Sequence, residues 1–124
     1  MSSQTILFVD DSPSMRQVIR ATLVSADYKT LEASDGYDAL EQLRTQGPVA
    51  LALIDVNMPR LDGIALVRAL RAMPETRFIP ILMLTTESRR ERRAEARLAG
   101  ATGWVVKPFV PEEMLAVVQR LLAR

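Results

Sequence analysis

Short runs of apolar residues alternate along the chain with segments whose apolar residues recur three or four positions apart. The first pattern predicts strands and the second predicts amphipathic helices. Strands are expected at residues 6–9, 29–33, 49–54, 81–84 and 103–106, each followed by a helix. This alternation, with its short connections, predicts a doubly wound α/β domain in which five helices cover both faces of a five-stranded parallel sheet.

Local signals mark where several of these elements begin and end. Ser12-Pro13 has the residue types preferred at an N-cap and at the first helical position. Ser88 and Glu91 have the spacing of a capping box before the fourth helix, and Gly47-Pro48 ends the second helix. Residues 49–54 lack polar positions, which is typical of a strand buried on both faces.

Composition narrows the classes of function. The chain has 124 residues, enough for one domain, and its net charge of +1 gives no general attraction to nucleic acid or to a membrane. It has no cysteine, which excludes disulfide and thiol chemistry and agrees with the cytoplasmic location that we expect. It also has no histidine, so any phosphoryl group that it handles must come from another molecule.

Charged and hydroxyl side chains follow four of the predicted strands. Because the carboxyl ends of parallel strands meet at one edge of a sheet, we expect these side chains to lie close together. Taken singly, each has a simpler interpretation as a helix cap or a solvated charge, but their combination favours a shared site. They are Asp10 and Asp11 after the first strand, Asp55 after the third, Thr85 after the fourth and Lys107 after the fifth.

The residue types at this edge suit phosphoryl transfer. Three carboxylates in a small volume repel one another unless a cation lies among them. Oxygen ligands without histidine or cysteine indicate a hard metal ion, which is Mg²⁺ in the cell. A carboxylate can attack phosphorus to form an aspartyl phosphate. Lys107 and the hydroxyl of Thr85 then provide a charge and a donor for phosphoryl oxygens.

The same residues belong to motifs that follow one another in a fixed order. These motifs are Val9-Asp10-Asp11-Ser12, Asp55-x-Asn57-Met58-Pro59 with Asp62-Gly63, Thr85-x-Glu87, and Lys107-Pro108-Phe109. In them the chain resembles the response-regulator receiver family over essentially its whole length. The resemblance implies a flavodoxin-like fold with strand order 2-1-3-4-5, and one receiver domain over residues 1–124 without an effector domain.

The resemblance also implies roles for individual residues. Asp55 is the implied phosphoryl acceptor, Lys107 contacts the phosphoryl group, and the peptide bond between Lys107 and Pro108 is cis. Asp11 would bind the metal ion directly, whereas Asp10 would act through water or by positioning. The implied magnesium ligands are Asp10, Asp11, Asp55 and the backbone carbonyl of Asn57.

Further matches resemble the single-domain chemotaxis type of receiver. They include Ser14-Met15-Arg16-Gln17 after the acidic pair, and Asn57 with Glu87, a pair found in chemotaxis members that lose their phosphate quickly. The resemblance implies a monomeric two-component response regulator with a histidine kinase as phosphodonor and a phosphatase as a further partner. The fourth helix, fifth strand and fifth helix would bind a downstream target, and the flagellar motor switch is the favoured one.

Two other functions stay open. One is a stand-alone receiver in a phosphorelay or another regulatory circuit, which these residues do not separate from a chemotaxis protein. The other is an aspartyl-phosphate phosphatase. The haloacid-dehalogenase type of phosphatase needs Asp-x-Asp after its first strand, where this chain has the adjacent Asp10 and Asp11. We therefore expect no turnover of a separate substrate, only self-catalysed phosphorylation and dephosphorylation.

The presumed output side has two features with open interpretations. The switch aromatic of the family, usually Tyr or Phe, corresponds to Trp104, which either reports the switch or lies on the surface. The fourth helix has a thin apolar side, chiefly Ala94, Leu98 and Ala99. Its basic run either favours an acidic partner segment or forms an ordinary solvated face. That run consists of Arg89, Arg90, Arg92, Arg93 and Arg97.

Overall fold

The structure, a computed structural model, describes residues 4–58, 60–86 and 90–123. Its centre is a parallel sheet in the order β2-β1-β3-β4-β5, as the family resemblance implied. Pro59, Glu87, Ser88 and Arg89 lie outside the described residues, and with them the expected capping box and two of the expected output residues. The strands are β1 (Thr5–Val9), β2 (Lys29–Ala33), β3 (Leu51–Asp55), β4 (Ile81–Thr85) and β5 (Gly103–Val106).

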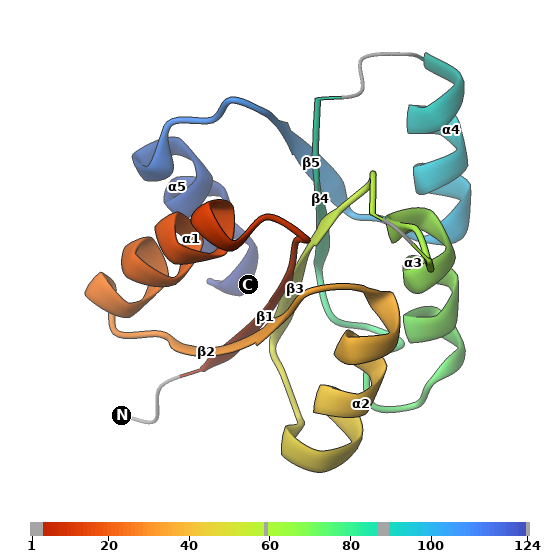
Figure 1. Ribbon diagram of the computed structural model, residues 1–124, viewed down its shortest axis with the longest axis horizontal. Helices are drawn as coiled ribbons and strands as arrows, with labels where there is room; N and C mark the ends of the chain where they lie inside the picture. The colour runs from red at the N-terminus through yellow and green to blue at the C-terminus, as the bar shows by residue number, and fades with distance from the viewer. Residues whose placement is uncertain (1–3, 59, 87–89, 124) are drawn as a thin grey trace.

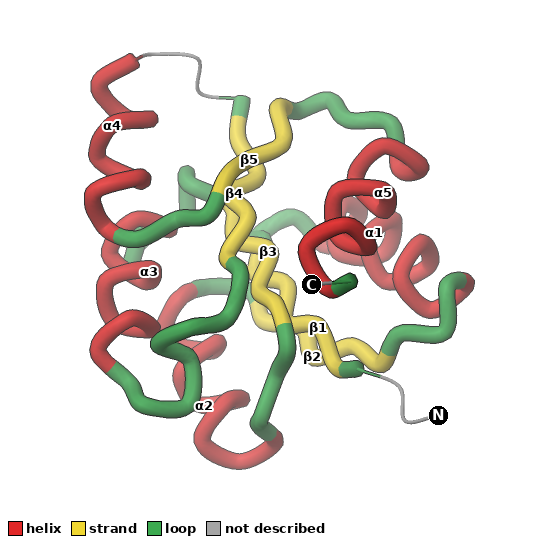
Figure 2. Tube along the Cα trace, turned by 180° about the vertical axis from the view of Figure 1, so that it is seen from behind, coloured by secondary structure: helices red, strands yellow, loops and turns green. Residues whose placement is uncertain are grey.

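Helices cover both faces of this sheet, so the predicted doubly wound α/β class is confirmed (Figure 1). The helices α1 (Pro13–Ser25) and α5 (Pro111–Leu122) lie together on one face. The opposite face carries α2, α3 and α4, and the view from behind shows the same two layers (Figure 2). No helix in the described ranges has the length and hydropathy needed to cross a bilayer. These three helices are α2 (Gly36–Gln46), α3 (Gly63–Ala72) and α4 (Arg90–Ala99).

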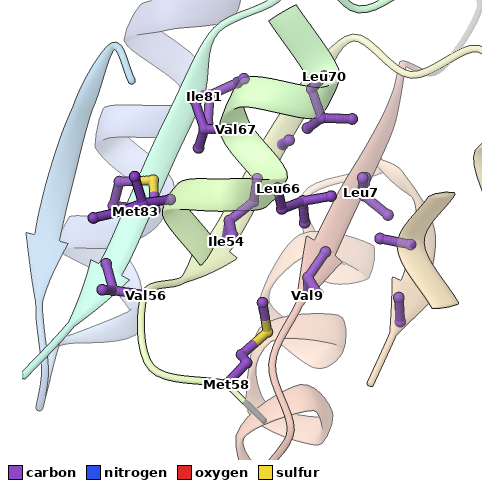
Figure 3. Packing of buried hydrophobic residues seen from close by; sticks show 14 of the residues in the cluster. Leu7, Val9, Ile54, Val56, Met58, Leu66, Val67, Leu70, Ile81 and Met83 are labelled. Carbon is purple, nitrogen blue, oxygen red and sulfur yellow. The ribbon is translucent and has the colours of Figure 1, made fainter. Parts of the chain in front are cut away.

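The central strands are buried on both sides. Every residue of β3 and β4 is buried, which agrees with the absence of polar positions in most of both segments. Figure 3 shows Leu66 and Leu70 of α3 directed toward the sheet, where they belong to the same apolar cluster as Ile54 and Met83. The first residue of α3, Gly63, lies directly against the backbone of Asp55 at the end of β3.

Three strands differ from the sequence prediction at one or both ends: β1 begins one residue earlier, at Thr5, and β3 and β4 have shifted boundaries. The third strand begins at Leu51, whereas the prediction began it at residue 49. Asp55 and Thr85 are the last residues of β3 and β4, whereas the prediction placed them directly after these strands. In the register of the sheet Asp55 lies opposite Leu84, and Thr85 lies opposite Val106. Sheet pairing therefore fixes the backbone of both polar residues.

The α4 helix packs on the domain differently from the prediction. Its buried residue is Ala96, while Ala94 is exposed and Leu98 is 88% exposed. The expectation that Ala94 and Leu98 form the inner face was therefore wrong, although Ala99 does pack against the apolar cluster. The prediction of a thin apolar side holds, with a different residue at its centre.

Arg71 connects α3 to the C-terminal end of α4. Its Nε and Nη2 donate to the carbonyl oxygen of Gly100 at 3.0 and 2.8 Å. Its Nη1 donates to the carbonyl oxygens of Thr76, Arg77 and Ile79 at 3.1, 2.9 and 2.7 Å. Gly100 has φ of +117°, a conformation that L side chains rarely adopt, and it ends α4 next to this guanidinium. One side chain therefore holds both the α3–β4 connection and the end of α4.

We expect Arg71→Gln to lower the free energy of unfolding by about 1.5 kcal/mol, because several carbonyl groups lose a charged donor. Arg68→Gln is the matched control, since Arg68 is exposed on the same helix and its replacement makes the same change of charge. Urea unfolding followed by circular dichroism measures both variants. Equal losses of stability in the two variants would show that the charge of α3 matters and the carbonyl contacts do not.

Candidate functional site

The carboxyl edge of the sheet brings three of the predicted site residues into direct contact. The Nζ atom of Lys107 lies 2.7 Å from Oδ2 of Asp10 and 3.5 Å from Oδ2 of Asp55. Asp10 is fully buried and Asp55 is 6% exposed, so this is a partly desolvated set of charges. The predicted convergence of strands β1, β3 and the segment after β5 is therefore found in the structure. The Lys107–Pro108 peptide bond is cis, as the resemblance implied.

A possible metal site is built by the three acids of this edge. Asp10, Asp11 and Asp55 each present a carboxylate oxygen, and these oxygens lie within 4.8 Å of one another. Asp11 is exposed, so the cluster opens to solvent on one side. A set of carboxylate oxygens without nitrogen or sulfur ligands fits Mg²⁺, which holds one or two carboxylates and keeps several water molecules. Asn57 is exposed and adjacent, and the role of its backbone carbonyl stays a prediction.

Asp10 is fixed from three directions. The backbone N–H of Ser12 donates to its Oδ1 at 2.9 Å, Lys107 holds its Oδ2, and Nη1 of Arg16 donates to its backbone carbonyl at 2.7 Å. Arg16 appeared in the sequence only as part of a motif, without a role. Its position one turn into the helix that follows the acidic pair is the signal that could have assigned it. Asp10 thus positions Lys107 while itself being held by β1 and α1.

The environment of Asp55 favours its neutral form. Burial raises the pKa of Asp55 to about 6, with a smaller contribution from the Asp10 carboxylate in the same direction. The ammonium group of Lys107 and the backbone N–H of Asn57, which donates to Oδ1 of Asp55 at 3.2 Å, lower this pKa in part. Only the ionised carboxylate is a nucleophile, and a cation among the acids favours the ionised form.

Thr85 completes the edge between β3 and β5. It is 2% exposed, and its carbonyl oxygen accepts a hydrogen bond from the backbone N–H of Lys107 at 2.8 Å. Thr85 and Lys107 are therefore linked through their backbones, and both are tied to the position of β4. The structure thus places all five predicted edge residues at one end of the sheet.

The connection between β3 and α3 is held at several points. Gly63 donates its backbone N–H to the carbonyl oxygen of Val56 at 3.0 Å, and the backbone of Asp55 packs directly against it. Asp62 caps α3 by accepting from the N–H of Ala65 at 2.9 Å. Its Oδ2 also lies 3.7 Å from Nη2 of Arg92 in α4. This ion pair links the acceptor side of the domain to α4, and the sequence had given no sign of it.

Trp104 on β5 is neither buried in the core nor free on the surface. It is half-buried and packs against the apolar cluster under α3 and α4. The guanidinium carbon of Arg93 lies 4.2 Å from the centre of its ring, a cation–π contact. The structure therefore does not support a Trp104 that lies free on the surface, and its role in reporting the switch stays a prediction. The two other expected output residues, Glu87 and Arg89, lie outside the described part of the chain.

This fold, with an acidic cluster and a lysine at the carboxyl edge of its sheet, defines the receiver class of signalling domains. The chain belongs to the response regulator receiver family, whose family model, described as "Response regulator receiver domain", matches residues 6–119. Domains of this family of the CheY type are signalling proteins and not classical enzymes.

Relatives and solved structures agree with this assignment. The chain is 38% identical over 120 residues to the chemotaxis protein CheY of Pseudomonas aeruginosa, covering 96% of each chain. The structure of the chemotaxis response regulator CheY4 of Vibrio cholerae has a TM-score of 0.91 and 42% sequence identity, and the match covers 97% of this chain and 99% of that chain.

A third relative bears on the metal. It is the receiver domain of a sensor histidine kinase from Pseudomonas aeruginosa, with a magnesium ion coordinated in its active site cleft. It has a TM-score of 0.89 and 31% sequence identity, and the match covers 99% of this chain and 100% of that chain. Receiver domains bind Mg²⁺ at an acidic pocket, and this chain has a cluster of three acids, Asp10, Asp11 and Asp55, that could hold a metal ion.

Proposed function

We propose that this protein is a response regulator whose receiver domain accepts a phosphoryl group on Asp55 from a histidine kinase. The observation that carries the proposal is the contact of Lys107 with the buried carboxylates of both Asp10 and Asp55. Independent helix caps would give no reason for a lysine after β5 to reach one acid that follows β1 and another at the end of β3.

Each residue of the site has a definite task in this reaction. An oxygen of the Asp55 carboxylate attacks phosphorus, and the bond from phosphorus to the histidine nitrogen of the kinase breaks. The ammonium group of Lys107 would pair with one oxygen of the phosphoryl group. The hydroxyl of Thr85 would donate a hydrogen bond to a second phosphoryl oxygen. Asp10 keeps Lys107 beside Asp55 until the phosphoryl group arrives. Mg²⁺, held by Asp10, Asp11, Asp55 and the carbonyl of Asn57, would supply charge neutralisation.

The state of Asp55 is proposed to be read at the face formed by α4, β5 and α5. The chemotaxis proteins among its relatives support a role in chemotaxis, with the flagellar motor switch as target and a phosphatase as a further partner. Trp104 would report the state of the site to that face, and Glu87 and Arg89 stay proposed output residues without a described position. We propose a cytoplasmic monomer that carries out only self-catalysed phosphorylation and dephosphorylation.

The same family also includes a receiver domain of a sensor histidine kinase, so family membership does not by itself exclude a phosphorelay. The two circuits differ in what the phosphorylated protein does next. In a phosphorelay the phosphoryl group leaves Asp55 for a histidine of another protein. In motor control it stays until hydrolysis while the protein binds its target. Incubating the radiolabelled phosphoprotein with a histidine phosphotransfer domain separates the two functions, because only the first transfers the label.

Mass spectrometry of the intact protein after treatment with acetyl phosphate and Mg²⁺ tests the acceptor. We expect one added phosphoryl group in the wild-type protein, and none in Asp55→Asn or in the presence of EDTA. Asp27→Asn is the matched control, because Asp27 is an exposed aspartate in the turn between α1 and β2, and it should be modified like the wild type. Modification that persists in Asp55→Asn would assign the acceptor to another residue.

A further inference from the structure

A hollow of about 330 Å³ lies between α4 and β5. It is lined by Arg93 and Arg97, which are one helical turn apart on α4, and by Trp104 of β5. Residues 101–103, where the chain passes from α4 into β5, complete the lining. The hollow is thus separate from the acidic cluster, since it lies beside β5 and not at the carboxyl edge of the sheet.

The charges in this hollow are not neutralised from within the described chain. The Nε atom of Arg93 is buried and has no hydrogen-bond partner among the described residues. Its guanidinium group lies over the ring of Trp104, a contact that uses the face of the cation and leaves its N–H groups in the plane. Arg92, by contrast, lies 3.3 Å from Glu95 and 3.7 Å from Asp62. Of these two neighbouring arginines, Arg92 is therefore paired with acidic side chains, whereas the Nε of Arg93 has no hydrogen-bond partner among the described residues.

A buried N–H without a partner is costly, and proteins rarely keep one without a ligand or another compensation. The group here is an arginine edge, which binds a carboxylate through two parallel hydrogen bonds. Arg97 adds a second positive charge one helical turn further along α4, and Trp104 offers an apolar surface in the same hollow. Together these groups match an acidic side chain with an apolar neighbour.

We infer that this hollow is a carboxylate-binding subsite for an acidic segment of a protein partner, in which Arg93 and Arg97 hold one carboxylate and Trp104 packs against the adjacent side chain. The inference rests on the proposed function, because α4 and β5 form the proposed output face. It goes further by naming the chemistry of the partner and the residues that recognise it.

Protein carboxylates are favoured over nucleic acid by the surrounding charge. The net charge of the whole chain is only +1, and Glu91 and Glu95 are interleaved with the arginines of α4. A polyanion with a phosphate at every step needs an extended basic stripe, and the acids would repel it. One carboxylate in a hollow of this size requires only the two arginines that line it.

An NMR titration of the unphosphorylated, metal-free protein with hexaglutamate tests the subsite, and hexaglutamine at equal ionic strength serves as the reference peptide. Trp104 is the only tryptophan, so its indole N–H gives a single resonance, and the Arg93 Nε–H gives a second probe. We expect both resonances to shift with hexaglutamate and neither with hexaglutamine. Arg93→Gln and Arg97→Gln should each weaken binding at least fivefold.

Arg90→Gln is the matched control, because Arg90 is exposed on the same helix and does not line the hollow. It should change the affinity less than twofold, and Arg93→Lys should restore only part of it because lysine has no planar pair of donors. The inference is overturned if Arg90→Gln and Arg93→Gln lose equal affinity for hexaglutamate, or if Arg93→Lys binds it as tightly as the wild type. Either result would show that only the net charge of α4 matters.

A second arm uses a six-nucleotide single-stranded DNA. If the DNA shifts both resonances in an Arg93-dependent manner while hexaglutamate does not, the inference of a protein partner is overturned. Phosphorylation of Asp55 is measured separately by mass spectrometry, so a failed titration leaves the proposed function standing. A failed phosphorylation with a successful titration would leave an acidic-peptide site without the proposed switch.

Discussion

Gly63→Ala is expected to lower the free energy of unfolding by about 3 kcal/mol or more, the range of severe overpacking in a core. A Cβ atom at this position would overlap the carbonyl oxygen of Asp55 and lie 2.8 Å from the Cα of Val56. Both neighbours belong to the backbone at the end of β3, so neither can turn aside as a flexible side chain would. Relieving the overlap must move α3 or the acceptor itself.

Gly103→Ala is the control for this variant, because it adds the same methyl group at another glycine next to the sheet. There the new Cβ would meet only Cδ2 of Leu82 at 3.7 Å, an ordinary contact. Urea unfolding measures both variants, and phosphorylation by acetyl phosphate measures the geometry of Asp55. A Gly63→Ala protein as stable and as readily phosphorylated as Gly103→Ala would show that the β3–α3 contact is much looser than the structure indicates.

The second large effect concerns the charge of Asp55 and appears as a dependence of stability on pH. Because the pKa of Asp55 rises from 3.8 to about 6 on folding, between these two pH values the native state holds a proton that the unfolded state has released. The stability from this group is complete below pH 3.8 and is lost as the pH rises through about 6. The full shift corresponds to about 3 kcal/mol, and solvent screening at the mouth of the site reduces it to about 2 kcal/mol.

Asp55→Asn removes this titration while keeping the shape of the side chain. In EDTA, we expect the variant to match the wild type near pH 4 and to exceed its stability by about 2 kcal/mol at pH 7. The difference between the two proteins is the quantity to measure, because other groups titrate in both. Glu32 is one of them, since hydrogen bonds from Arg20 and Arg16 lower the pKa of its carboxyl. A difference that stays constant from pH 4 to pH 7 would contradict the shifted pKa.

Much of this structure could be predicted because its strongest determinants are local. The apolar run before Asp55 and the glycine or proline signals around each helix depend only on neighbouring residues. The meeting of Asp10, Asp55 and Lys107 followed from one additional rule, that parallel strands end at the same edge. The local strand and helix signals, together with the rule that parallel strands end at the same edge of a sheet, were therefore enough to locate the acidic cluster.

The parts that the sequence left open depend on contacts between distant segments. Leu98 has the spacing of an inner-face residue, but Ala96 is buried because the short side chain permits close packing of α4. The cation–π contact of Arg93 with Trp104 and the hold of Arg71 on Gly100 likewise join segments far apart in the chain. No periodicity encodes such pairs, because an arginine has the same appearance in sequence whether it is solvated or bound.

The four residues of β5 and the lysine that follows them also set a length scale. Trp104 and Lys107 are three residues apart, which in an extended strand corresponds to roughly 10 Å. The acidic cluster and the proposed partner subsite are thus joined by one short segment of backbone, whose far end, Lys107, donates a hydrogen bond to Thr85. In such a domain, substitutions on α4 would change which partner binds, while the acidic cluster that would accept the phosphoryl group stays the same.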